Sequence, residues 1–559
     1  MMGMLKMKKY DKAKILKTTF MFIIVLFFII NILLPITTLF IKSFYIHGTF
    51  IGFGNFKTVI KNDGLLQAFG NSITVSSIVT IITIFIAFLF AYGIERTNIK
   101  GKKFFEVSAI LPLFAPTMTY GIALIYIFGS KGILTTGFFG YLNNLKLTFN
   151  IYGKLGIIIA EILYTFPAVY LMILAGFKTI DYSLYEVADI MEVSLFRRFY
   201  TITLPNIKNN IINAFFTAFI MCFTDFGIPK IIGGNYDVLA LKFYQYVIGQ
   251  NQFEMGAVIA VLLLIPSLLY FIIYNYIIKN TYDNKNIRSY KIKKNIVRDI
   301  FFYVYNIIIS FNIILVFVIL FFASVIKNWP YDLSITLKYY NVKSVGISLL
   351  NVYKNTILIA FTTALIGTIV VFITAYIVER YKNFSTLRNS LRIMALLPLS
   401  VPGMVIGLSY ILFFNKSWNV FNFLYGTFFV LILANIIHFF SVPFFTISEH
   451  LKKMDKNFEE VSECMGIPWY ITLVKVILPI SKFPIIKSFE YYFINSMVTI
   501  SAVSFLYTSK TKIASIEILN KSDSGDIATS AAIAITIVII NLVIKFIFNK
   551  ARKSEIYKG

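Results

Sequence analysis

Two short polar segments contain the residues of this chain whose types and spacing suit binding to another molecule. The first runs from Tyr185 to Pro205, YEVADIMEVSLFRRFYTITLP, and the second from Phe458 to Pro479, FEEVSECMGIPWYITLVKVILP. Glu186 and Glu460 lie at equivalent positions, each 19 residues before the proline of a Leu-Pro pair. A carboxylate at such a place can cap a helix or form a charge-assisted contact with a partner. The chain therefore contains one polar feature twice, flanked by long apolar stretches.

Both segments are predicted to fold as helix, turn and helix before the Leu-Pro pair. An apolar stripe at helical spacing marks the first helix of each segment. The stripe residues are Leu184, Val187, Ala188 and Met191 in the first segment, and Phe458, Val461, Ser462 and Met465 in the second. We expect a capping box at Ser183 and Glu186, and a looser one at Asn457 and Glu460.

The residues that follow these helices are suited to a tight turn. Gly466 can end its helix in a left-handed conformation, Pro468 suits the first turn of the next helix, and Ser194 can cap the corresponding helix of the first segment. The segments then end where apolar sequence resumes, at Leu204-Pro205 and Leu478-Pro479.

Two interpretations of these segments remain open. In one, Glu186 and Glu460 only cap their helices, and the apolar stripes rest on other parts of the chain. In the other, each helix docks a partner subunit, burying its stripe with a carboxylate alongside. The match of the two segments in position, register and distance to Leu-Pro favours docking, because a structural cap alone does not require that match.

Three ionisable residues interrupt apolar stretches elsewhere: Glu161 in IIIAEILYTFP, Asp225 in FTDFG and His438 in NIIHFF. Ionisable groups at membrane depth are costly and commonly functional, so we treat all three as candidates for a solute pathway. The alternative is that each forms a hydrogen bond with a neighbouring helix or lies near an interface. Asp225, beside Gly227 and Pro229, could also shape a gate.

The sequence lacks the residues of common catalytic and metal sites. Its three histidines, His47, His438 and His450, are too scattered for a metal site, and Cys222 and Cys464 indicate no disulfide framework. It contains no Gly-x-x-x-x-Gly-Lys-Ser/Thr phosphate loop, so the chain cannot hydrolyse ATP by that route. We therefore expect no catalytic residue, no metal site and no cofactor in this chain.

The elements that position these residues must be membrane helices. The chain has 559 residues, of which 58% are hydrophobic and 14% charged, with a mean hydropathy of +0.78. Soluble domains have roughly 25% charged residues. About twelve apolar stretches have the length of about 20 residues that a membrane helix needs. We predict an all-α integral membrane protein whose spans cover about 20–41, 68–94, 105–129, 154–177, 206–232, 254–279, 299–326, 354–378, 390–414, 423–447, 482–507 and 526–549.

The chain is a tandem duplication. AYGIER, ending at Arg96, matches AYIVER, ending at Arg380, and LPLFAPTMTYGIALIYIF matches LPLSVPGMVIGLSYILFF. We predict a first half at 1–279 with a candidate docking helix near 183–192, a basic linker at 280–297, and a second half at 298–559 with a candidate docking helix near 457–466. Six spans in each half make the halves parallel copies, and such copies commonly hold a pathway between them. The matched prolines are expected to break their spans: Pro112, Pro116, Pro398 and Pro402.

The net charge of +26 reflects the membrane topology of the chain and does not indicate nucleic-acid binding. Counting spans, most lysines and arginines fall in loops on one side, which the positive-inside rule makes cytoplasmic. We therefore expect a multi-pass protein of a bacterial plasma (inner) membrane, with both termini cytoplasmic, the lipid bilayer as its surroundings and no nucleic-acid partner.

The second segment resembles a known signature. Its spacing Glu-x-Ala/Ser-x-x-x-Gly, with Leu-Pro about twelve residues after the glycine, is similar to the cytoplasmic signature of binding-protein-dependent ATP-binding-cassette importer permeases. The resemblance implies that the first helix fits a cleft on an ATPase and transmits its closure. The matching residues are Glu460, Val461, Ser462 and Gly466, and Glu186, Val187 and Ala188. Glu192 stands where the glycine belongs, which implies that the two ATPase contacts differ.

The resemblance covers nearly the whole chain and implies the partners. The paired Glu-Arg and Leu-Pro-x-x-x-Pro stretches look like fused permeases of the ferric-iron branch, while Thr224–Ala257 and Thr499–Ala532 look like its members that import 2-aminoethylphosphonate. The implied function is solute import by ATP-driven alternating access. The implied partners are an ATP-binding-cassette ATPase in two copies, which carries ATP and magnesium, and an extracytoplasmic solute-binding protein.

The competing class is a self-sufficient secondary transporter driven by an ion gradient. Such a protein would need coupling carboxylates deep in several spans, and Glu161 is the one clear candidate. Co-purification of an ATPase separates the two classes.

Overall fold

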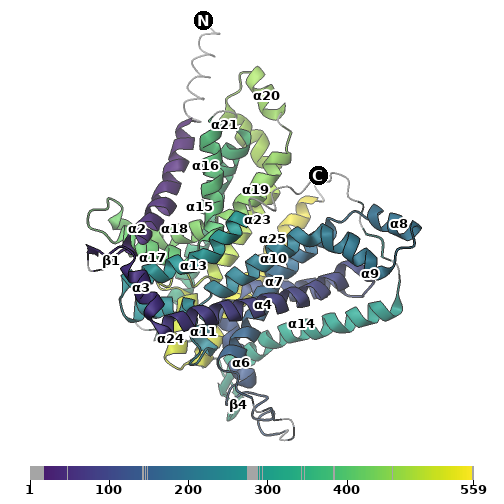
Figure 1. Ribbon diagram of the computed structural model, residues 1–559, viewed down its shortest axis with the longest axis vertical. Helices are drawn as coiled ribbons and strands as arrows, with labels where there is room; N and C mark the ends of the chain where they lie inside the picture. The colour runs from purple at the N-terminus through teal and green to yellow at the C-terminus, as the bar shows by residue number, and fades with distance from the viewer. Residues whose placement is uncertain are drawn as a thin grey trace. The chain divides into compact units, whose positions relative to one another are not determined.

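A computed structural model describes residues 18–556, except 47, 142–143, 145, 148, 274–287, 289, 293, 342, 345–346, 382–383 and 456. His47 and most of the predicted linker at 280–297 therefore lie outside the described residues. Helices dominate the described chain (Figure 1). Its strands form three short two-stranded pairs, which are β1 (Tyr45–Ile46) with β2 (Thr49–Phe50), β3 (Ile326–Asn328) with β4 (Asp332–Ile335), and β5 (Lys343–Ser344) with β6 (Ile347–Ser348).

The all-α membrane class is confirmed. Among the described residues, seven helices are long and apolar enough to cross a membrane, or up to eleven if each of four bent helix pairs is one span. The seven are Thr18–Lys42, α4 (Asp63–Arg96), α7 (Lys154–Lys178), Phe253–Tyr270 of α13 (Phe253–Ile273), α14 (Ile296–Val325), α15 (Leu349–Arg380) and Ile527–Lys550 of α25 (Ile527–Ile556). The predicted span at 206–232 falls mostly on α10 (Leu204–Thr224), which is not among the eleven. Lys208 and several asparagines make this helix less apolar than the others.

Prolines bend two matched spans, as predicted. Lys102–Phe114 and Met118–Phe128 (α6) meet at 107°, and Ser385–Ser400 and Gly403–Phe414 (α17) meet at 111°. A bend frees backbone carbonyls, which need partners at membrane depth. Tyr120 Oη donates to the carbonyl of Pro112 at 2.5 Å, and Ser441 Oγ donates to that of Ala395 at 2.9 Å. At each bend, a side chain of the protein thus donates to a backbone carbonyl.

The described residues form two compact units, and each unit contains segments that are far apart in the sequence. Unit 1 comprises the described parts of Met1–Ile51, Ser344–Ile516 and Ile539–Gly559, and unit 2 comprises those of Gly52–Lys343 and Glu517–Val538. In unit 1, the N-terminal α2 (Leu34–Lys42) packs on α17 from the second repeat. In unit 2, α14 packs on α4, α5 (Lys102–Ile110) and α6 from the first repeat. The predicted halves thus describe the repeats of the sequence, whereas packing places the first span of each repeat with the other repeat.

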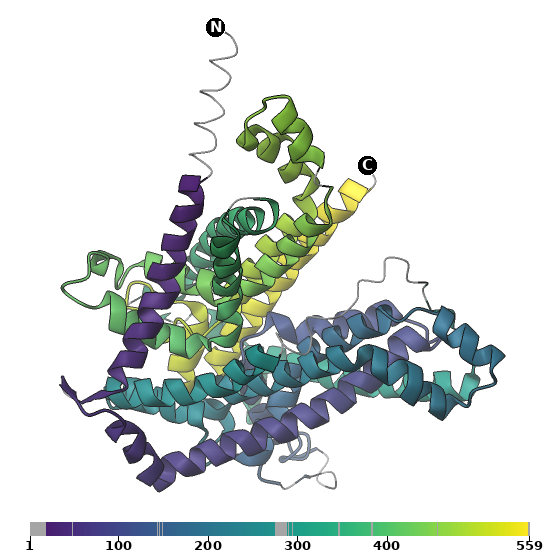
Figure 2. The ribbon, with the colours of Figure 1, turned by 45° about the horizontal axis from the view of Figure 1, so that its top comes forward.

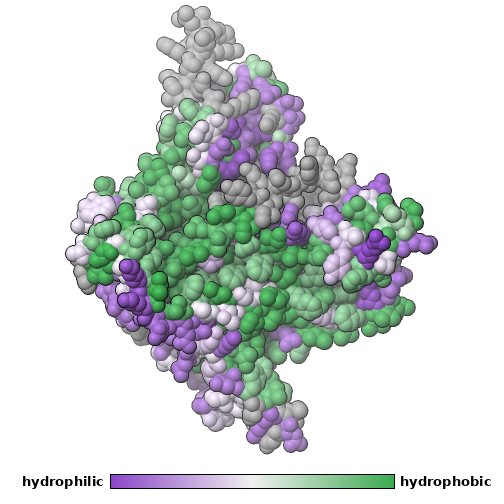
Figure 3. All heavy atoms as spheres, in the orientation of Figure 1, coloured by the Kyte–Doolittle hydropathy of each residue, from purple (hydrophilic) through white to green (hydrophobic). Residues whose placement is uncertain are grey.

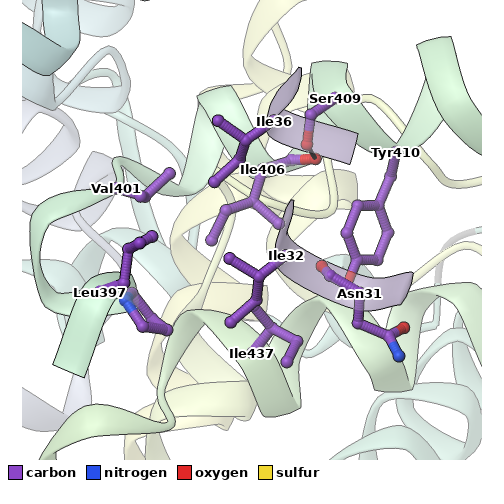
Figure 4. A pocket seen from close by; sticks show the side chains of 10 residues that line it. Asn31, Ile32, Ile36, Leu397, Val401, Ile406, Ser409, Tyr410 and Ile437 are labelled. Carbon is purple, nitrogen blue, oxygen red and sulfur yellow. Dashed lines mark hydrogen bonds between the residues drawn. The ribbon is translucent and has the colours of Figure 1, made fainter. Parts of the chain in front are cut away.

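Within unit 2, α4, α7 and α10 pack side by side (Figures 1 and 2). Within unit 1, a cavity of about 10 Å³ lies between the N-terminal helix, the bend at Leu397 and Pro398, and α17 (Figure 4). Tyr410 Oη donates to the carbonyl of Asn31 beside it at 3.0 Å. A cavity of this size holds about one water molecule, so it is too small for a solute.

Candidate docking segments

The two polar segments have the same order of elements. In the first, α8 (Ser183–Ile190) and α9 (Leu195–Arg198) precede a π-helical turn, η4 (Phe199–Thr203), and α10. In the second, α20 (Asn457–Cys464) and α21 (Trp469–Thr472) precede η10 (Leu473–Ile477), α22 (Leu478–Ile480) and α23 (Lys482–Val498). This is the predicted order of helix, turn and helix leading into Leu-Pro.

The π-helical turns have a common cause in the Leu-Pro pairs. A proline inside a continuous helix lacks the N–H donor, and its ring clashes with the carbonyl four residues earlier. Pro205 and Pro479 each follow a five-residue π turn by two positions. The wider turn accommodates the ring without ending the helix.

Both segments make the same left-handed turn, although their residues differ. Gly466 has φ +66° and Glu192 has φ +51°. The amides that follow close the same hydrogen bonds, from Val193 N to Ala188 O at 3.0 Å and from Ile467 N to Ser462 O at 2.8 Å. Glu192 therefore forms the same turn as Gly466. Its backbone is strained, because a non-glycine residue is disfavoured in the left-handed conformation.

The cap predicted at Ser183 is wrong in its acceptor group, whereas the cap at Ser194 is confirmed. Asp181 Oδ1 accepts the amide of Ser183 at 3.1 Å, and the equivalent Asp455 Oδ1 accepts that of Asn457 at 3.0 Å. The side chain of Ser183 caps nothing. Aspartate two residues before a helix forms this local bond readily, and the Ser183 amide is the main reason that the pKa of Asp181 lies below its usual value. Ser194 Oγ accepts the amide of Arg197 at 3.4 Å.

Both segments expose apolar side chains at the ends of their units. In the first, Ile190 is 83% and Met191 70% exposed, and Leu184, Val187, Leu195 and Phe196 are exposed as well. In the second, Val461 is 56% and Met465 66% exposed, beside Phe458. Figure 3 shows α8 and α20 at patches of mixed hydrophobic and hydrophilic side chains, in contrast to the hydrophobic surface over the long helices.

The remaining predicted site residues of the two segments differ from one another in burial and in contacts. Ala188 is 4% exposed, so it faces the protein, and its carbonyl accepts from Arg198 Nη2 at 3.2 Å. Ser462 Oγ donates to the carbonyl of Phe458 at 2.8 Å. Glu186 lies 3.5 Å from Arg288 Nη1, while Glu460 is exposed on α20. At the segment ends, the side chains of Leu204 and Pro205, and of Leu478 and Pro479, are half-buried or exposed.

A buried ion pair, which sequence reasoning missed, anchors the second segment. Arg380 Nε donates to Glu459 Oε1 at 2.6 Å, and Nη2 binds the other oxygen of the same carboxylate. The carbonyls of Leu451, Met454 and Asp455 accept from the same guanidinium at 2.6–3.3 Å. A bidentate pair with further acceptors is the arrangement that makes a buried ion pair favourable. The signal in the sequence was the repeated Glu-Arg pair that ends at Arg380.

The three pathway candidates lie in different surroundings. Glu161 is fully buried in α7, and Asp225 and Cys222 are its polar neighbours within unit 2. Asp225 lies between α10 and α11 (Gly227–Ile232), where its Oδ2 accepts the amide of Ile228 at 2.8 Å. His438 ends α18 (Phe428–His438) in unit 1, close to Gly403. The structure thus brings Glu161 and Asp225 together.

Comparisons with known proteins agree with the duplication. The family described as binding-protein-dependent transport system inner membrane component matches residues 83–281 and 372–551, so each match contains one polar segment. A ferric transport system permease protein of Actinobacillus pleuropneumoniae is 27% identical over 98% of this chain and 79% of its own length. A putative ferric transport system permease protein of Haemophilus influenzae is 27% identical over 91% of this chain and 80% of its own length. A solved bacterial alginate ABC transporter in complex with a periplasmic protein covers 49% of this chain and 99% of its own, with 18% identity and a TM-score of 0.41.

Proposed function

We propose a function for this chain from the premise that it belongs to the family of binding-protein-dependent transport system inner membrane components. It is a multi-pass permease subunit of an ABC transporter of that family. We propose that it carries a small solute into a bacterial cell by alternating access, and that a separate ATPase in two copies drives the change. ATP and magnesium bind to that ATPase, and both termini of this chain lie in the cytoplasm.

The observation that carries this proposal is the pair of matched helices α8 and α20. Each ends in the same left-handed turn, and each exposes apolar side chains beside a carboxylate, Glu186 or Glu460. An amphipathic helix with an exposed apolar face fits a groove on a partner. Because each repeat contributes one such helix, two copies of one ATPase subunit account for both.

The proposed cycle links these helices to the spans. In the first segment, α9, η4 and α10 follow one another without an intervening turn, whereas in the second a 76° bend after Ile480 separates η10 and α22 from α23. A displacement of the docking helix is passed to the span through the left-handed turn and this short helical stretch. A partner can shift this equilibrium only if its contacts differ between the two states, and ATP-dependent closure of the ATPase supplies that difference. On the opposite side, the loops at 42–66, 233–253, 327–353 and 508–525 receive the solute-loaded binding protein.

For the solute, ferric iron is the first candidate, since two relatives that span most of this chain are named for ferric transport. The second candidate is 2-aminoethylphosphonate, favoured by the stretches Thr224–Ala257 and Thr499–Ala532. Uptake of radiolabelled ferric iron and of radiolabelled 2-aminoethylphosphonate, each with its own binding protein, separates them.

Charge reversal by Glu460→Lys tests the docking role. We expect this variant to lose ATP-driven uptake in vesicles and to bind the ATPase less tightly. Glu449→Lys on α19 (Ser441–Lys453), a reversal near but outside the docking helix, should retain both activities. Unchanged uptake by Glu460→Lys would contradict the docking role, and uptake that follows a proton gradient without any ATPase would support a secondary transporter instead.

A further inference from the structure

Arg96, the last residue of α4, is a buried cation without a carboxylate partner among the described residues. Its side chain is 2% exposed, and Nη2 donates to the carbonyl of Phe177 at 3.0 Å. Nε and Nη1 have no hydrogen-bond partner in the described part of the chain. The guanidinium instead lies over three aromatic rings, at 4.0 Å from the centroid of Tyr290, 5.2 Å from Tyr185 and 5.7 Å from Phe177. Desolvated contacts of this kind offset part of the cost of burying the charge.

In the second repeat, a carboxylate stabilises the equivalent buried arginine. Arg380, equivalent to Arg96, is paired with Glu459 in α20. The residue at the position of Glu459 in the first repeat is Tyr185 in α8. An aromatic ring therefore stands in the first repeat where the second has a carboxylate, and one ring is a weaker partner for a buried guanidinium than a bidentate carboxylate. The first repeat needs another contact, and Tyr290 provides the shortest one.

Tyr290 belongs to the connector between the repeats, and this connector also holds the start of α8. The carbonyl of Arg288 accepts the amide of Tyr182 at 3.1 Å, and the amide of Arg288 donates to Asp181 Oδ1 at 3.4 Å. The ring of Tyr290 lies edge-on to those of Tyr182 and Tyr185, with centroids 5.4 and 5.1 Å away. These contacts lie on the buried side of α8 and leave Ile190 and Met191 exposed.

We propose that Tyr290 and Arg288 of the connector are positioning residues of the first docking helix, and that Tyr290 does for α8 through Arg96 what Glu459 does for α20 through Arg380. This inference rests on the proposed docking function of α8. The connector then helps to position the first docking helix, in addition to joining the two repeats. It also gives the two docking helices different anchors, one aromatic and one ionic.

The test measures how often α8 leaves its position, and it needs no ATPase. In a Cys464→Ser background, Ala188→Cys places a thiol on the buried side of α8, and its maleimide labelling rate reports opening. We expect Tyr290→Ala to raise this rate about thirtyfold, since a desolvated cation–π contact is worth about that factor. Tyr290→Phe should stay within about threefold of the parent, because the ring makes the contact. Lys294→Ala, an exposed lysine of the same connector, is the matched control and should leave the rate unchanged.

Rescue distinguishes positioning from general damage. In the Tyr290→Ala background, Tyr185→Glu recreates the arginine–carboxylate pair of the second repeat, so labelling should return to within a few-fold of the parent. ATPase affinity, measured separately, should fall with Tyr290→Ala and recover with the same second change. A labelling rate for Tyr290→Ala within twofold of the parent, or no rescue by Tyr185→Glu, would overturn the inference. A parent protein that binds no ATPase but shows these labelling changes would contradict the proposed function and leave the connector's role intact.

Discussion

Truncating the exposed apolar side chains of α20 is the most direct quantitative test of docking. Val461→Ala and Met465→Ala together remove surface that only a partner can bury, because 56% and 66% of these residues are exposed. The two exposed portions amount to slightly more than one whole side chain. Burying one such side chain is worth about 1.5–3 kcal/mol, and alanine retains part of that surface. The double variant should therefore weaken ATPase binding by about 2 kcal/mol, or roughly thirtyfold in Kd.

The chain contains its own reporter for this measurement. Cys464 is exposed on α20 next to Met465, whereas Cys222 is buried in α10. A docked ATPase should protect Cys464 from maleimide, and the ATPase concentration that gives half-protection measures the affinity. Cys222 should stay unlabelled throughout, which shows that the variant remains folded.

A matched control separates docking from a general loss of apolar surface. Val420→Ala, in the loop between α17 and α18, removes a valine that is also exposed, and it should leave the half-protection concentration unchanged. If the double variant in α20 shifted this concentration by less than about twofold, the exposed stripe would not be the docking surface. Protection of Cys464 from maleimide in the absence of ATPase would also refute the argument, because the protection could then not be assigned to docking.

Three further variants test the local geometry. Glu192→Gly should relieve the left-handed strain at φ +51° and stabilise the first turn by about 1 kcal/mol, measured as slower proteolysis between α8 and α9; faster cleavage would contradict this. Glu459→Gln should lower the thermal unfolding midpoint, since a hydrogen bond to a charged group is worth about 1.5–3 kcal/mol, whereas Glu463→Gln on the exposed side of α20 should not. Gly403→Ala should reduce the yield of folded protein, because its Cβ would lie 2.3 Å from Ser501 Oγ and 3.0 Å from His438 Cε1. Adding Ser501→Gly should restore part of that yield, and a normal yield from Gly403→Ala alone would show that the neighbours give way.

The repeats made much of the fold predictable. Matching the two halves located the bends at Pro112 and Pro398, the turn after α20 and the pair of helix–turn–helix segments. These features depend on residues close in sequence, such as a proline without an N–H donor or a glycine with φ +66°. Local chemistry of this kind can be read without knowing what packs against it.

Other features depend on contacts between distant parts of the chain, so the sequence did not disclose them. Periodicity shows that a helix has an apolar face but not which repeat covers it, so the exchange of α2 and α14 was missed. The same limit explains why Ala188 was placed on the exposed stripe, and why Tyr290 was not singled out in a basic linker. The cap at Ser183 failed for a different reason, since Asp181, which lies outside the predicted capping box, accepts the Ser183 amide that Glu186 was expected to accept, and only geometry selects between the two carboxylates.

The exchange of first spans affects how the chain can be made. The N-terminal helix finishes at Lys42, but α17, its packing surface, begins at Gly403. At a synthesis rate of roughly 5–20 residues per second, the helix spends tens of seconds in the lipid before its neighbour emerges from the ribosome. During membrane insertion it must therefore remain a lone span, exposed to insertases and quality-control proteases, and a nascent chain that stalls in the first repeat would leave this helix permanently unassembled.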